Sequence, residues 1–403
     1  MATGAATLLI SAFLLAASAG AADLSVNCDL GESLQAAIDS LDFAGPNSIT
    51  LTGACTENVQ IEGRRNLIIA APDGQTATLQ AADSTLAALR LIAAQNILLR
   101  RLVIRGGRWG ILAGRASETL LSECTLENNG EGLFAIDNSL AGLVEGTAVR
   151  NNGTGLAAAT NASFIIREGV VIENNAGVAV QLFSAAAAIV NGNTIRNNGA
   201  GVNALHRSSV EFSGQNTVQN NGAFGLQVAQ GSVATFNTTP SFMGPVGFTT
   251  IEGHTVVGVN VVNGGTLTFA GPHKVRNNGT ATQALRSGIR VGRNSFLTTG
   301  GGTEITSNVG PGVRADLDAV LTFVATTITG NSEEGVRLVR LSSADFISGN
   351  AISGNGGASI FCDTTSLVVG DLTGIENVQC MRVERESGPP RPGTLNPPGG
   401  PNP

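Results

Sequence analysis

Apolar residues along this chain occur in short alternating runs that restart every 23 residues over much of its length. A polar turn, Asn-Asn-Gly or a close variant, follows these runs at positions 128, 151, 174, 197, 220 and 277. A Gly and an aliphatic residue come just after most of these turns, as in Gly132-Leu133 and Gly201-Val202. A fixed period of this size indicates a solenoid, in which each repeat buries its apolar face against its neighbours. We therefore predict one repetitive domain.

A representative coil, residues 200–222, contains three predicted strands, Val202–Leu205, Val210–Phe212 and Thr217–Gln219. Small β-branched residues alternate there with Thr, Ser and Asn, which is typical of strands and lacks the 3.6-residue spacing of helices. Strands this short, restarting once per coil, are expected to pair in parallel with the same strand of the next coil. Asn and Gly supply left-handed backbone in the turns, and stacked Asn side chains are expected to hydrogen-bond along the solenoid.

Residues in three columns are predicted to point into the interior. The first column holds the first and third residues after the repeat Gly, as in Val202 and Ala204. The second strand contributes a predicted internal aromatic stack of Phe212, Phe236, Phe269 and Phe323. The third strand contributes an aliphatic column of Leu126, Val149, Ile172, Ile195, Val218, Val275, Ile305 and Ile328. Residues 226–257 and 279–287 interrupt the period, so longer loops are expected there.

The two ends of the solenoid need protection, because an open end exposes apolar side chains and unpaired strand edges. Ser33 to Leu41 is predicted to form a short amphipathic capping helix. Cysteines bracket this helix and the last coil, and in an exported protein they suggest two disulfides, each contributing about 2–4 kcal/mol. The predicted pairs are Cys28 with Cys55 and Cys362 with Cys380, which leaves Cys124 as a buried, inert thiol.

The chain begins with a segment that is typical of a secretory signal, residues 1–22. Its apolar core, Leu8 to Ala17, is shorter than the roughly 20 residues of a membrane helix, and small residues follow it. We therefore expect export, with no membrane span after the signal is removed. The solenoid domain is predicted over residues 23–381. Residues 382–403 are rich in Pro and Gly and are predicted to be a disordered tail.

Charge and aromatic content narrow the possible functions. The net charge of −7 argues against a nucleic-acid partner, whose phosphates need a broad basic face. Aromatic residues are only 4% of the chain and Tyr is absent, which weakens any interpretation based on stacking against sugars. The single tryptophan, Trp109, follows Arg108 in a Gly-Gly-Arg-Trp-Gly run, and we interpret it as a packing residue of an early coil.

The 23-residue coils, the Gly-aliphatic strand starts, the Asn-Asn-Gly turns and the helical cap resemble secreted bacterial right-handed parallel β-helix proteins, the pectate-lyase-like superfold. The resemblance covers roughly residues 25–380. It implies an all-β, right-handed parallel β-helix of about 23 residues per coil with an N-terminal capping helix, and export by a bacterium to the periplasm, the cell surface or the medium. It does not specify an activity, because polysaccharide lyases, hydrolases, epimerases and adhesins share this superfold. The Gly-His-Gly, Tyr-centred and Arg-x-Trp motifs of its polygalacturonase-like, alginate-epimerase-like and pectin-methylesterase-like members are missing.

A column of arginines is the clearest candidate for a ligand-binding site. Arg290, Arg314 and Arg337 each stand two residues after a repeat Gly and are predicted to face outward on successive coils. Neighbouring parallel strands are about 4.8 Å apart, so these like charges repel unless something anionic compensates them. Elsewhere the chain alternates its charges in one predicted outward column, Glu127, Arg150, Glu173 and Arg196.

Two further interpretations concern the carboxylates near these arginines. Arg314, Asp316 and Asp318 are predicted to alternate on one face, where a lyase could hold Ca²⁺ and a base, or a hydrolase could use the two Asp residues as acid and base. Alternatively Asp316 and Asp318, with Glu333 and Glu334, only neutralise the arginines as a solvated network. No cofactor is expected, and Ca²⁺ is expected only if the protein is a lyase. The Asn-Gly turns lack the Asp of calcium-binding nonapeptide repeats, and no metal site is predicted there.

The sequence thus predicts an exported, monomeric β-helix protein that associates with extracellular or cell-surface polysaccharide, without established catalysis. The arginine column makes an acidic polysaccharide the expected partner. One alternative is a polysaccharide lyase or hydrolase that acts on acidic glycans through the Arg314 region. The other alternative is a purely structural surface protein or adhesin.

Overall fold

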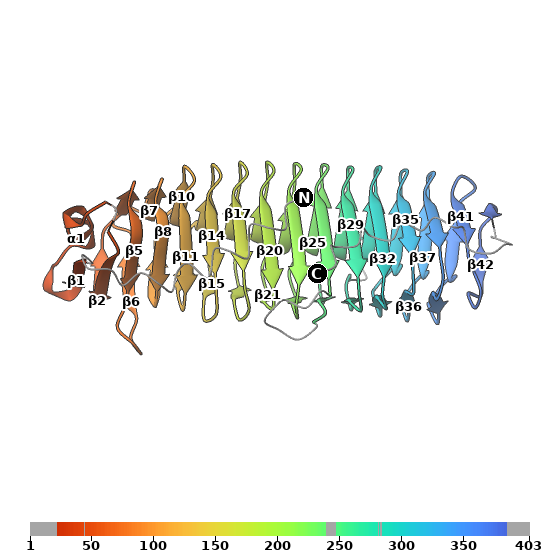
Figure 1. Ribbon diagram of the computed structural model, residues 1–403. Coiled ribbons are helices and arrows are strands. Elements are labelled where there is room, and N and C mark those ends of the chain that lie inside the picture. The colour runs from red at the N-terminus through yellow and green to blue at the C-terminus, as the bar shows by residue number, and fades with distance from the viewer. Residues whose placement is uncertain (1–21, 44, 239–246, 281, 283, 385–403) are drawn as a thin grey trace, which may run out of the picture.

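The computed structural model describes residues 22–43, 45–238, 247–280, 282 and 284–384. The coils lie side by side along one axis, and each complete coil contributes one strand to each of three parallel sheets (Figure 1). The predicted parallel β-helix is therefore confirmed. The predicted signal lies outside the described residues except for Ala22, and so do residues 385–403 of the predicted tail.

Sheet A, the first sheet of each coil, has 16 strands in parallel order. They are β1 (Ala22–Asn27), β2 (Asn47–Thr52), β5 (Arg65–Ala70), β8 (Gln95–Arg100), β11 (Glu118–Ser122), β14 (Leu140–Leu143), β17 (Ser163–Ile166), β20 (Ala187–Asn191), β23 (Ser209–Ser213), β26 (Val233–Asn237), β29 (Thr266–Ala270), β32 (Phe296–Gly300), β35 (Val320–Phe323), β38 (Ser343–Phe346), β41 (Leu367–Gly370) and β43 (Val383–Glu384).

Sheet B comes next in each coil and is built from 13 short strands. They are β3 (Ala54–Thr56), β6 (Ala77–Gln80), β9 (Leu102–Arg105), β12 (Thr125–Glu127), β15 (Ala148–Arg150), β18 (Val171–Glu173), β21 (Thr194–Arg196), β24 (Thr217–Gln219), β27 (Thr250–Glu252), β30 (Lys274–Arg276), β33 (Glu304–Thr306), β36 (Thr327–Thr329) and β39 (Ala351–Ser353).

Sheet C completes each coil with one of 14 strands and carries the candidate site. They are β4 (Val59–Glu62), β7 (Ala87–Ile92), β10 (Trp109–Gly114), β13 (Glu131–Ala135), β16 (Thr154–Ala158), β19 (Val178–Leu182), β22 (Ala200–Ala204), β25 (Phe224–Ala229), β28 (Val257–Val262), β31 (Ser287–Gly292), β34 (Val313–Asp316), β37 (Val336–Val339), β40 (Ile360–Cys362) and β42 (Val378–Gln379).

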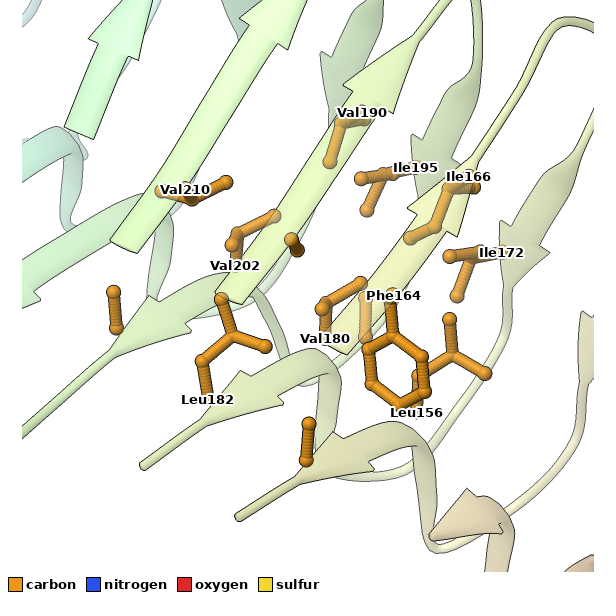
Figure 2. Close-up of a cluster of buried hydrophobic side chains, with 14 of the residues drawn as sticks. Leu156, Phe164, Ile166, Ile172, Val180, Leu182, Val190, Ile195, Val202 and Val210 are labelled. Carbon is orange, nitrogen blue, oxygen red and sulfur yellow. The ribbon is translucent and has the colours of Figure 1, made fainter. Parts of the chain in front are cut away.

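The interior is filled by the three predicted columns, which are all buried. Figure 2 shows part of this core, where Val180 and Val202 of sheet C, Phe164 and Val190 of sheet A, and the isoleucines of sheet B point toward one another. The aromatic stack is real but has a gap, because Thr299 lies between Phe269 and Phe323 in the strand register. Phe269 packs against Phe236 of the preceding coil, with centroids 4.4 Å apart and ring planes tilted by 31°. Phe323 stacks instead on Phe346, with ring centroids 4.9 Å apart.

The two residues of each Asn-Asn pair have separate tasks. The first Asn adopts the left-handed conformation, as at Asn128 with φ of 55°, which lets the chain turn sharply. The second is buried and forms a ladder, in which the side-chain amide of Asn129 donates to Oδ1 of Asn152 at 3.1 Å. The predicted Asn ladder is therefore confirmed. It continues through Asn175, Asn198 and Asn221, and then through His254 in place of an Asn, to Asn278, Asn308, Asn331 and Asn355.

The N-terminal end is closed by helix α1 (Leu34–Ser40), which confirms the predicted cap. Ser33 caps this helix by accepting a hydrogen bond from the Ala36 N–H, and Leu34 and Ile38 are buried against the first coils. A short 3-10 turn, η2 (Cys28–Leu30), precedes it. No helix in the described part of the chain is long and apolar enough to span a membrane.

Both predicted disulfides are formed, Cys28–Cys55 near the first coil and Cys362–Cys380 near the last. Cys124 is free and buried, and burial raises the pKa of its thiol to about 11, so it stays protonated and unreactive. At the C-terminal end, β43 pairs with β41, so sheet A extends three residues past the predicted domain end at 381.

The two predicted interruptions differ in character. Within 226–257 the three sheets continue through β25, β26 and β27, so the interruption of the period is confined to part of that range. The additional residues fall between Asn237 and Thr250, where 239–246 lie outside the described residues. Within 279–287 the extra residues come directly before β31, whose first residue is Ser287.

Candidate functional site

The three arginines predicted as a column are neighbours on sheet C. Arg290 of β31 pairs in register with Arg314 of β34, which pairs in register with Arg337 of β37. The residues on either side of each arginine, such as Val313 and Ala315, are buried in the interior, so the arginines face outward. Their side chains are 16%, 25% and 36% exposed along this order, because neighbouring residues cover their stems.

Asp316 joins the arginine column, whereas Asp318 does not. Asp316 ends β34, its side chain is only 6% exposed, and its Oδ2 lies 3.5 Å from Nη2 of Arg290 and 3.8 Å from Nε of Arg314. Leu317 and Asp318 then adopt left-handed backbone, with φ of 58° and 61°, and Asp318 is an exposed turn residue. The prediction that Asp318 shares a strand face with Arg314 is wrong, because the alternation of faces stops where the strand stops.

The arginine column is less well neutralised than the alternating column of sheet B. There Glu127, Arg150, Glu173 and Arg196 are register neighbours, as predicted. Nε of Arg150 lies 3.0 Å from Glu127, and Nε of Arg196 lies 2.7 Å from Glu173, so each arginine has its own close carboxylate. In the arginine column two guanidiniums share Asp316, and every ion-pair distance is 3.5 Å or longer.

Several buried polar atoms of the arginine column make no hydrogen bond within the described part of the protein. They are Nε of Arg290, Arg314 and Arg337, Oδ1 of Asp316 and Oε2 of Glu334. Buried polar groups are nearly always paired, so a concentration of unpaired ones indicates a place for water or a ligand. The donors among them are cationic, which favours an anion.

The insertion before β31 lies beside this column. Nη1 of Arg314 donates a hydrogen bond to the carbonyl oxygen of Ala284 at 3.1 Å, and Nη2 of Arg286 pairs with Glu333 at 2.7 Å. Arg337 lies 3.7 Å from Glu334 on one side and above the ring of Phe361 on the other, 5.5 Å from its centroid. The insertion thus contacts the middle of the column through Ala284 and brings a further arginine, Arg286, with its partner Glu333 into the site.

The charges of the site sum to a small positive excess. Four arginines, 286, 290, 314 and 337, face three carboxylates, Asp316, Glu333 and Glu334, which gives +4 − 3 = +1. Burial lowers the pKa of the Arg314 guanidinium, Asp316 opposes this effect, and the neighbouring arginines add to it. Bringing a negative group to the column would relieve this unfavourable burial of positive charge.

A ladder of side-chain amides extends the arginine column toward the N-terminal coils. Asn203 donates to Gln181 at 3.1 Å, Gln227 donates to Asn203 at 3.1 Å, and Asn260 donates to Gln227 at 2.9 Å. Arg290 then donates to Oδ1 of Asn260 at 3.3 Å, which connects the two sets into one polar track across seven strands, β19 to β37. The sequence carried a signal for this ladder, since Asn203, Gln227 and Asn260 occupy the same position after the repeat Gly as the arginines.

The acidic residues of this site do not form a group with metal-ligand spacing. Within the described ranges the group with suitable spacing is Cys28, Cys55 and Glu57, and both of its sulfurs are joined in a disulfide. The arrangement around Arg314 therefore presents fixed cations and amides on a sheet surface, which suits binding of an extended anionic molecule.

Part of the solenoid matches a known family model. The match is to the right handed beta helix region and covers residues 58–221. A search of curated proteins gave no match.

Solved structures of similar shape include an alginate lyase from Paenibacillus sp., with 16% identity, a TM-score of 0.44, and coverage of 63% of this chain and 95% of that one. They also include the A-module of a mannuronan C-5 epimerase from Azotobacter vinelandii, with 15% identity, a TM-score of 0.49, and coverage of 89% and 95%. A lacto-N-biosidase from Eubacterium ramulus has 9% identity, a TM-score of 0.41, and coverage of 91% and 67%. At these identities no activity is transferred to this chain.

Proposed function

We propose that this right-handed parallel β-helix protein binds an acidic polysaccharide along the outer face of sheet C, with Arg290, Arg314 and Arg337 contacting its carboxylates. The observation that carries the proposal is the incomplete neutralisation of the column, in which two guanidiniums share the single carboxylate of Asp316. In the alternating column of sheet B, Arg150 and Arg196 each have a close carboxylate partner of their own. A ligand carboxylate would complete the pairing that the fold leaves incomplete.

The spacing of the column favours a polymer over a small anion. Strands of a parallel sheet repeat at about 4.8 Å, which is close to the length of one sugar unit in an extended chain. A polyuronate that runs parallel to the solenoid axis therefore presents about one carboxylate to each coil. The amides of Asn203, Gln227 and Asn260 continue the track with groups that hydrogen-bond hydroxyls. The overall charge of −7 would repel polyanions elsewhere, so binding is expected at this face.

Binding without catalysis is favoured by the position of the carboxylates. A general base has to reach the proton that it removes, within hydrogen-bond distance. Asp316 is almost fully buried and held between Arg290 and Arg314, while Asp318 lies in the following turn. This geometry supports an orienting role for Asp316. The two disulfides support export of the protein to an oxidising compartment, where such polysaccharides occur.

The proposal is tested by titration calorimetry with oligogalacturonate and oligomannuronate, with neutral dextran as the control ligand. Wild-type protein is expected to bind at least one of the oligouronates and not dextran. Arg314→Ala is expected to weaken that binding roughly tenfold, the effect of losing one charge-assisted hydrogen bond. Arg196→Ala is the matched control, because Arg196 is an arginine of a stacked column that already has a close partner. Equal losses in the two variants, or no uronate binding at all, would contradict the proposal.

A further inference from the structure

Sheet C carries a second cluster on its early coils, away from the arginine column, built from aromatic side chains. Trp109 lies on β10 and Phe134 on β13, and Phe183 directly follows β19. The ring centroids of Trp109 and Phe134 are 6.4 Å apart, and those of Phe134 and Phe183 are 6.3 Å apart. The ring planes of these two pairs are 20° and 25° apart, and all three residues are half-buried. They therefore form a continuous, partly exposed apolar surface, whereas the sequence had indicated only a packing residue.

Two buried polar atoms without hydrogen bonds lie in the same cluster. Trp109 and Glu131 are register partners on β10 and β13, and neither Nε1 of the indole nor Oε2 of the carboxylate makes a well-aligned hydrogen bond within the described residues. Burial raises the pKa of Glu131, and it outweighs the opposing effects of Arg108 and of the indole N–H. The guanidinium of Arg108, an exposed residue, lies over the indole ring at 4.4 Å. The indole N–H and the Glu131 carboxylate thus interact with each other beside an apolar surface, and Nε1 and Oε2 have no other hydrogen-bond partner within the described residues.

We propose that Trp109, Glu131 and Phe134 form a binding subsite for an uncharged sugar ring. A sugar ring has an apolar face of C–H groups, which packs on aromatic side chains, and a rim of hydroxyls, which both donate and accept hydrogen bonds. The hydroxyls would hydrogen-bond to the Glu131 carboxylate and the Trp109 indole, whose Nε1 and Oε2 atoms otherwise have only each other. A uronate ring fits less well, because its carboxylate would approach that of Glu131.

This subsite is independent of the arginine column, although both lie on sheet C. Six inter-strand steps separate β13 from β31, which corresponds to roughly 29 Å at about 4.8 Å per step. Each of the two sites can therefore fail its test without affecting the other. If both exist, the protein would hold the neutral and the acidic portions of one glycan, or two glycans, on a single sheet.

The chain offers a direct optical probe of this subsite. Trp109 is the only tryptophan and the chain contains no tyrosine, so its ultraviolet-excited emission above that of phenylalanine comes from the subsite itself. Titration with the hexasaccharides of cellulose, xylan and β-mannan is expected to give a saturable change in that emission with at least one of them, since a bound ring excludes water from the indole. Oligogalacturonate of the same length is expected to produce a much smaller change.

Phe134→Ala and Glu131→Gln are each expected to weaken the optical titration roughly tenfold, since each removes a major contact of the bound ring. Glu131→Gln keeps the size of the side chain, so it remains informative if Phe134→Ala lowers the melting temperature. The control variants are Phe296→Ala, which removes an exposed aromatic from sheet A, and Arg314→Ala. No emission change with any of the three neutral hexasaccharides would overturn the proposal. The proposal would also be overturned if the emission change were the same in Phe134→Ala and Glu131→Gln as in wild type. An equally large emission change with oligogalacturonate would overturn it too.

Discussion

His254 shows how one side chain can replace another in a repeated structure. It occupies the ladder position that Asn holds in the neighbouring coils, between Asn221 and Asn278. The backbone N–H of Asn221 donates to Nδ1 of His254 at 3.2 Å, and Nε2 lies 3.1 Å from the carbonyl oxygen of Val218. This pattern requires a neutral ring with its proton on Nε2, where an Asn would place its amide group.

Acid is expected to destabilise the protein through this residue. Burial lowers the pKa of His254 from 6.5 to about 4. The unfolded chain therefore binds a proton below pH 6.5, whereas the folded chain binds it only near pH 4. The stability contributed by the neutral ring is complete above pH 6.5 and declines as the pH falls to about 4, by roughly 3 kcal/mol.

The measurement is the free energy of unfolding against pH for wild type and His254→Asn. The variant restores the amide of the ladder, so it should match wild type at pH 7 and lose less stability between pH 6.5 and 4. His206→Asn, at an exposed turn position, is the control and should follow the wild-type curve. Identical pH profiles for His254→Asn and wild type would contradict this account of the ladder.

The aromatic stack provides a second test at the scale of one residue. Phe269 is buried, and its ring centroid lies 4.4 Å from that of Phe236, while Thr299 follows it on the next coil. Phe269→Ala should leave a cavity and lower the free energy of unfolding by about 3–5 kcal/mol in chemical denaturation. Phe296→Ala, whose side chain is 48% exposed on the adjacent strand, should change it little. A loss below about 1 kcal/mol for Phe269→Ala would mean that the ring does not face the interior.

Some residue positions follow from the sequence, and others do not. The buried columns could be predicted because alternation within a strand follows from backbone geometry. Asp318 was misplaced because the turn after β34 uses Leu317 and Asp318 in left-handed conformations, and Leu carries no signal for that conformation. The cluster around Trp109 could not be predicted from the sequence, because its neighbours Glu131 and Phe134 belong to the next coil.

At the scale of strands, position within the repeat decides which side chains meet. Side chains that follow the repeat Gly by the same number of residues align on sheet C, which is how Asn203, Gln227 and Asn260 come to share one ladder. The three arginines could be predicted from this rule because they are like charges on successive coils. The contact of Ala284 with Arg314 could not, because the path of an insertion is not constrained by the repeat.

The amide ladder predicts a dependence on ligand length. A uronate trimer needs only the three arginine-bearing strands, whereas a heptamer reaches all seven strands of the track. The double variant Asn203→Ala, Gln227→Ala should therefore bind the trimer like wild type and the heptamer roughly tenfold more weakly, since two neutral hydrogen-bonding groups are lost. The affinities of the trimer and the heptamer for wild type and for the double variant are measured by calorimetry. Equal heptamer affinities would mean that the ligand contacts the arginines and not the amide ladder.

At the scale of the whole molecule, each coil contacts mainly its neighbours, so the two ends are the places where the solenoid can open. The disulfide Cys362–Cys380 secures the last coil, and Cys28–Cys55 secures the first. Cys362→Ala with Cys380→Ala should lower stability by roughly 2–4 kcal/mol and accelerate amide hydrogen exchange in β40 to β43. Exchange in β13 to β25 should be unchanged. Uniform acceleration along the chain would show that the ends do not open separately.

The central claim is that the arginine column binds an acidic glycan. The most direct test is the melting temperature of wild type and of Arg314→Ala, each measured without ligand, with oligogalacturonate and with oligomannuronate. A ligand that binds the folded state raises the melting temperature. We expect such a rise in wild type with at least one of them and little or none in the variant. Without ligand, the variant should be as stable as wild type or slightly more stable, because Arg290 still pairs with Asp316 and one crowded cation is gone. A variant that is less stable than wild type, together with a wild type that neither oligouronate stabilises, would contradict the claim and make the column a structural ion-pair network.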